Sequence, residues 1–200
     1  MKDTANYMKF YMRSGGCLDF SRDTLDFFPM EDVLFSLAKE HRFFNQIEWS
    51  VLQHSIACGI AGDILYGDNA LLVKHLYVHD FTEAFLRDVP AVVKCKEYKE
   101  IEHEVQTKIF NFINLPHLGV DDHAYLKGID IHMRLVETFY LYASPECFEA
   151  IKAEVGPIEP EVLLACTDAF LKVQTMDMFD ENLDISNGVV ELFKSVLRKY

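Results

Sequence analysis

The sequence predicts an all-α fold, a bundle of six to eight helices formed by a single domain spanning residues 1–200. Apolar residues recur at three- and four-residue spacing through most of the chain, which is the period of a helix with one buried face. Alternation of β-branched residues at period two, the pattern typical of strands, is almost absent. No internal repeat or Gly/Ser-rich linker divides the chain, and half of its residues are hydrophobic, so one domain with a sizeable core is expected.

The expected elements begin after an N-terminal segment of about thirty residues. Residues 18–28 mix aromatic side chains with Asp and Ser, and we expect an irregular or short extended segment there. Pro29 suits a helix start, and the spacing of Val33, Leu34 and Leu37 predicts a helix from residue 30 to about 41. Further helices are expected over residues 47–66, from 70 to just before Pro90, and over 96–113, 124–142, 160–174 and 187–200.

The composition argues against several classes of partner and location. The formal net charge of -13 disfavours nucleic acid polymers and anionic membranes, because binding either requires clustered Lys and Arg. No apolar run approaches the roughly 18 residues of a membrane span. The five cysteines are scattered without a C-x-x-C pair, and no signal peptide is evident, so a cytoplasmic protein with reduced thiols is expected.

Four residues form a candidate metal site: His54, the adjacent pair His79 and Asp80, and Asp130. Imidazole nitrogens and carboxylate oxygens suit a divalent transition metal such as Zn, Mn, Co, Fe or Ni. His79 and Asp80 follow the apolar run 71–78, where an ionisable group must be paired or metal-bound to offset the cost of desolvation. Open coordination positions on such an ion can take water and a phosphoryl oxygen.

Around these residues the chain resembles the HD-domain phosphohydrolases, specifically their small 5′-deoxynucleotidase branch. The resemblance covers residues 12–142 and fades beyond residue 156, which leaves 157–200 as a C-terminal helical extension. Its blocks are, in order, MRSGG at 12–16, MEDV at 30–33, HRFFN at 41–45, WSVLQHS at 49–55, HDFTEAF at 79–85, DVP at 88–90, YKEIE at 98–102 and KGID at 127–130, with Glu137 two turns further on.

The resemblance implies that His54, His79, Asp80 and Asp130 are the metal ligands. It also implies that Glu83 orients or deprotonates the attacking water, and we expect it one helical turn beyond His79 on the same face. Asp88 is implied to protonate the leaving oxygen or to position the nucleophile. An alternative for Glu83 is an exposed ion pair with Arg87, four residues further on.

Three more residues are implied to bind substrate. Arg42 resembles the family's phosphate-binding arginine, and its planar guanidinium suits phosphate oxygens, although it could instead be a helix-end cation. Phe43 stands where relatives often have tryptophan and is expected to crowd the sugar, unless Phe44 takes that place and Phe43 packs in the core. Lys94 matches a commonly basic position and is otherwise a surface lysine.

The expected function is hydrolysis of the 5′-phosphate of deoxynucleoside monophosphates. One alternative is a deoxynucleoside triphosphate hydrolase, as in phage relatives that deplete dATP, with Lys94, Lys96 and Arg13 as candidate cations for the longer phosphate chain. Another is a non-catalytic nucleotide-binding HD module. The resemblance also implies a homo-oligomer, because relatives commonly form dimers or larger rings.

Overall fold

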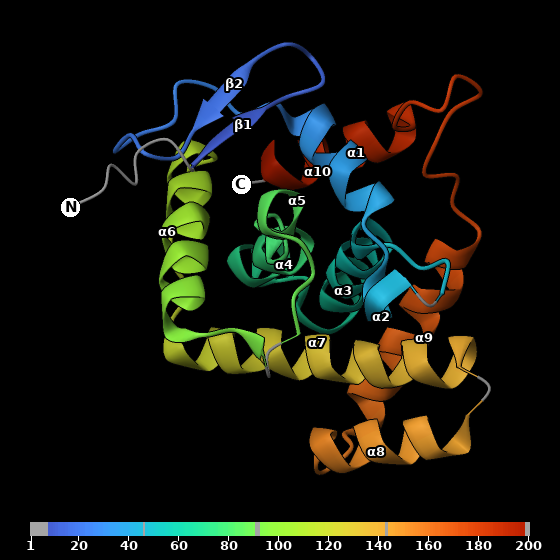
Figure 1. The fold of residues 1–200 in the computed structure, drawn as a ribbon. Coiled ribbons are helices and arrows are strands. Elements are labelled where there is room, and N and C mark those ends of the chain that lie inside the picture. The colour runs from blue at the N-terminus through green and yellow to red at the C-terminus, as the bar shows by residue number, and fades with distance from the viewer. Residues whose placement is uncertain (1–7, 46, 91–92, 143, 199–200) are drawn as a thin grey trace.

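The computed structural model describes residues 8–45, 47–90, 93–142 and 144–198, without the side chains of Phe44 and Asn45, and it confirms the expected all-α class. The described part contains eight helices of nine or more residues, two four-residue helices and one two-stranded sheet (Figure 1). The longer helices are α1 (Met30–Lys39), α3 (Val51–Tyr66), α4 (Ala70–Val78), α6 (Lys96–Phe112), α7 (Val120–Leu141), α8 (Pro145–Val155), α9 (Pro160–Gln174) and α10 (Asn187–Arg198). The short helices are α2 (Arg42–Asn45) and α5 (Glu83–Leu86).

The N-terminal segment forms a hairpin at the edge of the helices. Strands β1 (Lys9–Tyr11) and β2 (Cys17–Asp19) are antiparallel, with Phe10 opposite Leu18. Leu18 and Phe20 are buried, and the ring of Phe20 packs edge-on against Phe85 of α5. The expected short extended segment is therefore present, and its apolar side chains attach it to the core.

Helix α3 lies in the middle of the bundle and packs against α4, α7 and α9 (Figure 1). Its start at Val51, later than the expected residue 47, is set by Ser50, whose side chain accepts from the Gln53 amide while the Gln53 side chain accepts from the Ser50 amide. A Cβ on Gly59 would lie 2.4 Å from the ring of Tyr77, so glycine permits the close approach of α3 and α4. This packing buries His54, Ser55 and Cys58 completely.

The single helix expected from residue 70 to Pro90 is wrong, because the chain turns between α4 and α5. Helix α4 ends at Val78, and the following turn has bonds from the Phe81 amide to the Val78 carbonyl at 3.1 Å and from the Glu83 amide to the Asp80 carbonyl at 2.9 Å. The imidazole of His79 hydrogen-bonds the Leu76 carbonyl at 2.9 Å, which satisfies an end group of α4. His79 and Glu83 consequently do not share one helix face as expected.

Helix α8 was not expected, and α7 begins at Val120, earlier than residue 124. Pro145 starts α8, and the side chain of Ser144 accepts a hydrogen bond from the Cys147 amide. None of the residues of α8 is fully buried. A helix that buries so little needs no regular spacing of apolar residues, and such spacing is the signal from which the other helices were expected. Helix α8 packs on α7 (Figure 1). In the described part of the chain, no helix combines the length and apolar character that crossing a membrane requires.

Candidate metal centre and its pocket

The four expected metal ligands come together where α3, α7 and the turn after α4 meet. The Nε2 atom of His54 lies 3.1 Å from Asp130 Oδ1 and 3.7 Å from Asp80 Oδ2. The Nε2 atom of His79 lies 3.3 Å from the same oxygen of Asp80. Residues from three separate parts of the sequence thus present nitrogen and oxygen atoms to one small volume.

The orientation of His54 is fixed by a buried carboxylate that the sequence did not assign a role. Glu137 on α7 accepts a hydrogen bond from His54 Nδ1 at 2.6 Å and from the indole Nε1 of Trp49 at 2.8 Å. Because this carboxylate accepts the hydrogen bond of Nδ1, Nε2 is directed toward Asp80 and Asp130, an arrangement common among metal-binding histidines. Glu137 lies seven residues after Asp130, which is two helical turns. This spacing places both side chains on the same face of α7 and could have indicated the position of Glu137.

The unpartnered nitrogen of His79 is the decisive feature of the cluster. Because its Nδ1 donates to the Leu76 carbonyl, a neutral His79 carries its lone pair on Nε2. Nε2 is buried and has no hydrogen-bond partner, yet it lies 3.3 Å from an oxygen of Asp80. These two atoms repel one another unless a proton or a metal ion lies between them, and the metal ion can also engage the other donor atoms of the cluster.

The spacing of the donor atoms fits a shared metal ion. Two donors about 2.1 Å from one ion lie about 3.0 Å apart at a right angle and about 3.4 Å apart at a tetrahedral angle. The separations of 3.1, 3.3 and 3.7 Å fall around these values. His54, His79 and the thiol of Cys58 also present ligand atoms within 4.8 Å of one another, so the group can hold a metal ion.

Three acidic side chains around the cluster have pKa values shifted from their usual ones. Burial, with added repulsion from Asp80 and Asp88, raises the pKa of Glu83 well above its usual value. Burial also raises the pKa of Asp88, although Arg42 opposes the shift. Burial alone would raise the pKa of Asp130 as well. The hydrogen bond and the charge of His54 outweigh burial and lower the pKa of Asp130. Glu83 and Asp88 are therefore suited to exchanging protons, whereas Asp130 stays ionised.

Glu83 does not form the exposed pair with Arg87 that was an alternative for it. Arg87 instead pairs with Glu40, and Oε2 of Glu83 is buried without a hydrogen-bond partner. Arg42 is also not an exposed helix-end cation. Its buried guanidinium lies 3.3 Å from Glu137 Oε2 and 3.7 Å from Asp80 Oδ2, beside the candidate metal ligands.

Phe43 and Lys94 both line the same pocket as Arg42. Phe43 adopts a φ of 55°, a left-handed conformation uncommon for a bulky residue, and its ring packs edge-on against Tyr142 at 5.3 Å. Lys94 forms an ion pair with Glu102 at 2.6 Å, so it is a paired cation rather than a free surface lysine. The side chain of Phe44, the alternative to Phe43, lies outside the described part of the structure.

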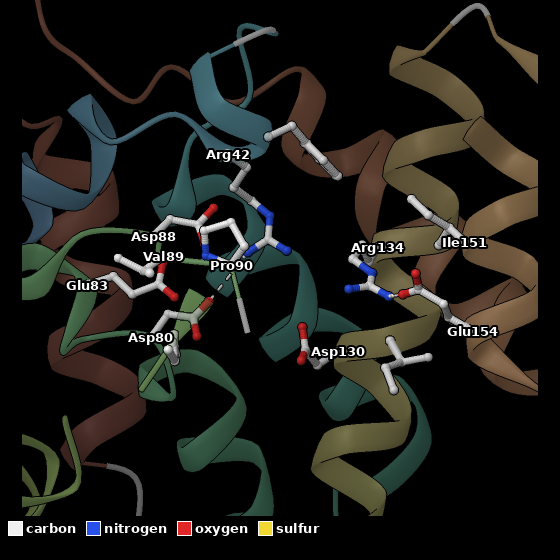
Figure 2. Close-up of a pocket in the computed structure, with 13 residues that line it drawn as sticks. Arg42, Asp80, Glu83, Asp88, Val89, Pro90, Asp130, Arg134, Ile151 and Glu154 are labelled. Carbon is white, nitrogen blue, oxygen red and sulfur yellow. Dashed lines mark hydrogen bonds and ion pairs between the residues drawn. The ribbon is translucent and has the colours of Figure 1, made fainter. Parts of the chain in front are cut away.

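The pocket has a volume of about 440 Å³ and contains Asp80, Glu83, Asp88 and Asp130 in its lining. Figure 2 shows Asp80, Glu83 and Asp88 on one side, Arg42 pointing between the two walls, and Arg134 with Glu154 on the opposite side. Sequence reasoning missed this second wall, which also includes Ile131 and Ile151. Arg134 lies one helical turn after Asp130, a spacing that places both on one face of α7.

A comparison of the sequence with protein-family models gives no match, and a comparison with curated proteins gives none either. The function of the chain is therefore inferred from its side-chain geometry and its motifs.

Proposed function

We propose that the chain is a metal-dependent phosphohydrolase of the HD-domain type that removes the 5′-phosphate of deoxynucleoside monophosphates. The observation that carries the proposal is the buried, unpartnered Nε2 of His79 facing Asp80, because a divalent cation satisfies both groups. His54, His79, Asp80 and Asp130 would hold the ion. When bound, a divalent transition metal lowers the pKa of water and withdraws charge from a phosphoryl oxygen.

The protein's own groups supply the remaining steps. Glu83 accepts a proton from the attacking water, and burial, which raises the pKa of its carboxyl, makes the carboxylate a stronger base. Asp88, whose pKa burial also raises, donates a proton to the leaving oxygen. The guanidinium of Arg42 holds the phosphate oxygens, and its ion pairs with Asp80 and Glu137 keep it oriented.

The charges of the pocket favour a monophosphate over a triphosphate. The cations in its described lining are Arg42, Lys94 and Arg134. Each already has a carboxylate partner. Arg42 pairs with Glu137, Lys94 with Glu102, and Arg134 with Glu154. A triphosphate would have to separate several of these pairs. The other candidate cations, Arg13 and Lys96, are not among the residues that line the pocket. Each of them also has a carboxylate partner, Asp184 for Arg13 and Glu100 for Lys96.

The size and walls of the pocket support a nucleotide. A volume of about 440 Å³ lies within the range of roughly 300–1,000 Å³ common for small-molecule sites. Phe43 supplies a flat apolar surface beside the phosphate-binding Arg42, and Ile131 and Ile151 extend the apolar wall. In the proposed function, these groups would hold a sugar and base next to a phosphate.

The test is anion-exchange analysis of products from a panel of deoxynucleoside mono- and triphosphates, with metal content measured on the same sample. We expect nucleoside and inorganic phosphate from monophosphates. Asp80→Asn should lose both metal and hydrolysis, whereas Asp168→Asn, an exposed change on α9, should keep both. Tripolyphosphate release would favour the triphosphate alternative, and binding without hydrolysis by metal-loaded protein would favour the non-catalytic module. Full metal occupancy in Asp80→Asn would contradict the ligand assignment.

A further inference from the structure

Cys58 lies directly against the candidate metal ligands and has no role in the function proposed above. It follows His54 by one turn of α3, so both side chains lie on the same face of that helix. Cys58 is fully buried, and its Sγ lies 3.4 Å from His54 Nε2. The sulfur and one nitrogen of each histidine, His54 and His79, lie within 4.8 Å of one another.

The separation between sulfur and nitrogen fits two ligands of one ion. With a metal–sulfur bond of about 2.3 Å and a metal–nitrogen bond of about 2.1 Å, a separation of 3.4 Å corresponds to an angle of roughly 100° at the metal. That angle lies between the octahedral and tetrahedral values. His79 Nε2, which is buried and lacks a hydrogen-bond partner, is a further donor atom beside the same cluster.

The hydrogen-bonding pattern points the same way. Glu137 contacts His54 Nδ1, so Nε2 of the same ring faces both the thiol of Cys58 and the carboxylate of Asp130. A metal ion bound at Nε2 would therefore have the sulfur of Cys58 within reach. Cys166, the other buried cysteine in the described chain, is different, because its Sγ contacts the Ile129 backbone carbonyl at 3.8 Å.

We propose that Cys58 is a fifth protein ligand of the metal, bound as a thiolate, so that the centre selects Zn²⁺, Co²⁺ or Fe²⁺ over Mg²⁺ and Mn²⁺. The metal–sulfur bond forms as the S–H bond breaks, the proton passes to solvent, and no oxidation state changes. Thiolate is a soft donor and favours these later ions over the harder ones. With five protein donors, a six-coordinate ion keeps one position for substrate or water. The inference rests on the proposed metal centre.

The test uses metal-free full-length protein titrated with Co²⁺ and followed by absorption spectroscopy. We expect a near-ultraviolet sulfur-to-cobalt charge-transfer band in the wild type and in Cys166→Ser, and its loss in Cys58→Ser. Cys58→Ala is made in parallel, because it removes the thiol without adding a buried hydroxyl. Competition titrations should show zinc binding weakened at least about tenfold in the Cys58 variants, with manganese binding changed by less than about twofold.

The outcomes separate this inference from the proposed function. A cobalt-loaded wild type without the charge-transfer band, or a band that persists in both Cys58 variants, overturns the thiolate ligand and leaves the other four ligands in place. Loss of the band in Cys166→Ser alone overturns it as well. A wild-type protein that takes up no cobalt, zinc or manganese overturns both the thiolate ligand and the metal centre.

Discussion

The two histidines of the candidate centre are each held by an acceptor on the nitrogen away from the cluster. His54 Nδ1 bonds the carboxylate of Glu137, and His79 Nδ1 bonds the backbone carbonyl of Leu76. Both Nε2 atoms are therefore directed inward before any ion arrives. Such orientation lowers the entropic cost of metal binding, since fewer rotamers are lost when the ion binds.

Glu137→Gln should weaken metal binding by roughly ten- to a hundredfold, the range typical of removing an outer-shell partner. The amide is nearly isosteric but uncharged, and its NH₂ group faces either the indole N–H of Trp49 or the guanidinium of Arg42. Metal titration with a chromophoric chelator measures the change. Trp49→Phe, which removes the indole donor and some ring volume but leaves the carboxylate of Glu137, should have a smaller effect. Equal affinities for wild type and Glu137→Gln would show that Glu137 has no influence on the ligand.

Glu83→Gln should keep the metal and lower kcat by roughly a hundred- to ten-thousandfold, the usual cost of removing a general base. Glutamine keeps the size of the buried side chain but cannot accept the proton. Steady-state kinetics with metal analysis on the same protein provides the measurement. Glu104→Gln, on the exposed side of α6 and paired only with Lys108, serves as the matched control. Near-normal turnover in Glu83→Gln would remove the residue from the proton transfer.

Phe43→Ala should reduce the preference for a deoxynucleotide over its ribonucleotide while metal binding stays unchanged. A 2′-hydroxyl crowded by this ring lacks a hydrogen-bond partner, a penalty of about 1–3 kcal/mol that corresponds to roughly ten- to a hundredfold in kcat/KM. The ratio of kcat/KM for the two sugars, measured in wild type and variant, tests the idea. An unchanged ratio would mean that the ring packs against Tyr142 and Arg42 without contacting the sugar.

At the scale of elements, the turn between α4 and α5 decides where the acidic residues Asp80 and Glu83 lie relative to the histidines. A continuous helix would have put His79 and Glu83 on one face. The observed turn instead brings Asp80 Oδ2 within 3.7 Å of His54 Nε2 and 3.3 Å of His79 Nε2, and it lets Glu83 begin a separate short helix that lines the pocket with Asp88. The break therefore separates His79 and Asp80, the proposed ligands, from Glu83, the proposed base, within a few residues.

The close packing of α3 on α4 gives a test at the same scale. Gly59→Ala should lower the free energy of unfolding by about 1–3 kcal/mol, because its Cβ would meet the buried Tyr77 ring, which is also held by a hydrogen bond to Asp63. Chemical denaturation measures the change.

Gly128→Ala is the matched control for this prediction. Gly128 lies inside α7 with nothing within 4 Å of the added Cβ, so alanine should stabilise the helix by about 0.5–1 kcal/mol. The same substitution should thus act in opposite directions at the two sites. Equal stabilisation at both would show that α3 and α4 can separate without cost.

At the scale of the whole molecule, the net charge of -13 makes a local cation necessary for any anionic substrate. The described pocket collects more carboxylates than cations in its lining, so a bound divalent ion would offset part of the excess. Homo-oligomer formation stays a prediction. Phe139 on α7 and Leu164 and Leu171 on α9 are exposed apolar residues in the described chain.

Removing the metal should lower the stability of the entire domain, because the ligands come from α3, α7 and the turn after α4. An ion at a hundred times its Kd adds about 2.7 kcal/mol, which for a chain of this size corresponds to roughly 5–10 °C in Tm. Calorimetry before and after chelation, followed by return of zinc, measures the shift. We expect zinc to restore the Tm of the wild type but not that of His54→Ala. A Tm that does not change on chelation would contradict the proposed metal centre.

The sequence by itself determined the helical class, most helix positions and the residues that meet at the candidate centre. Period and capping residues are local properties, so α3, α9 and α10 could be predicted from them within a few residues. The four expected ligands were predicted from motif order, and their side chains do lie together.

Only the tertiary structure decided how those residues are arranged. The turn after Val78 depends on a side-chain bond from His79 to a backbone carbonyl, which hydrophobic spacing does not encode. Helix α8 escaped prediction because it buries little, and the second pocket wall depends on its packing against α7. The inward direction of the His54 nitrogen depends on Glu137, eighty-three residues away from His54 in sequence. Contacts over such separations form only when the whole chain folds, because many weak packing terms jointly fix the distance between helices.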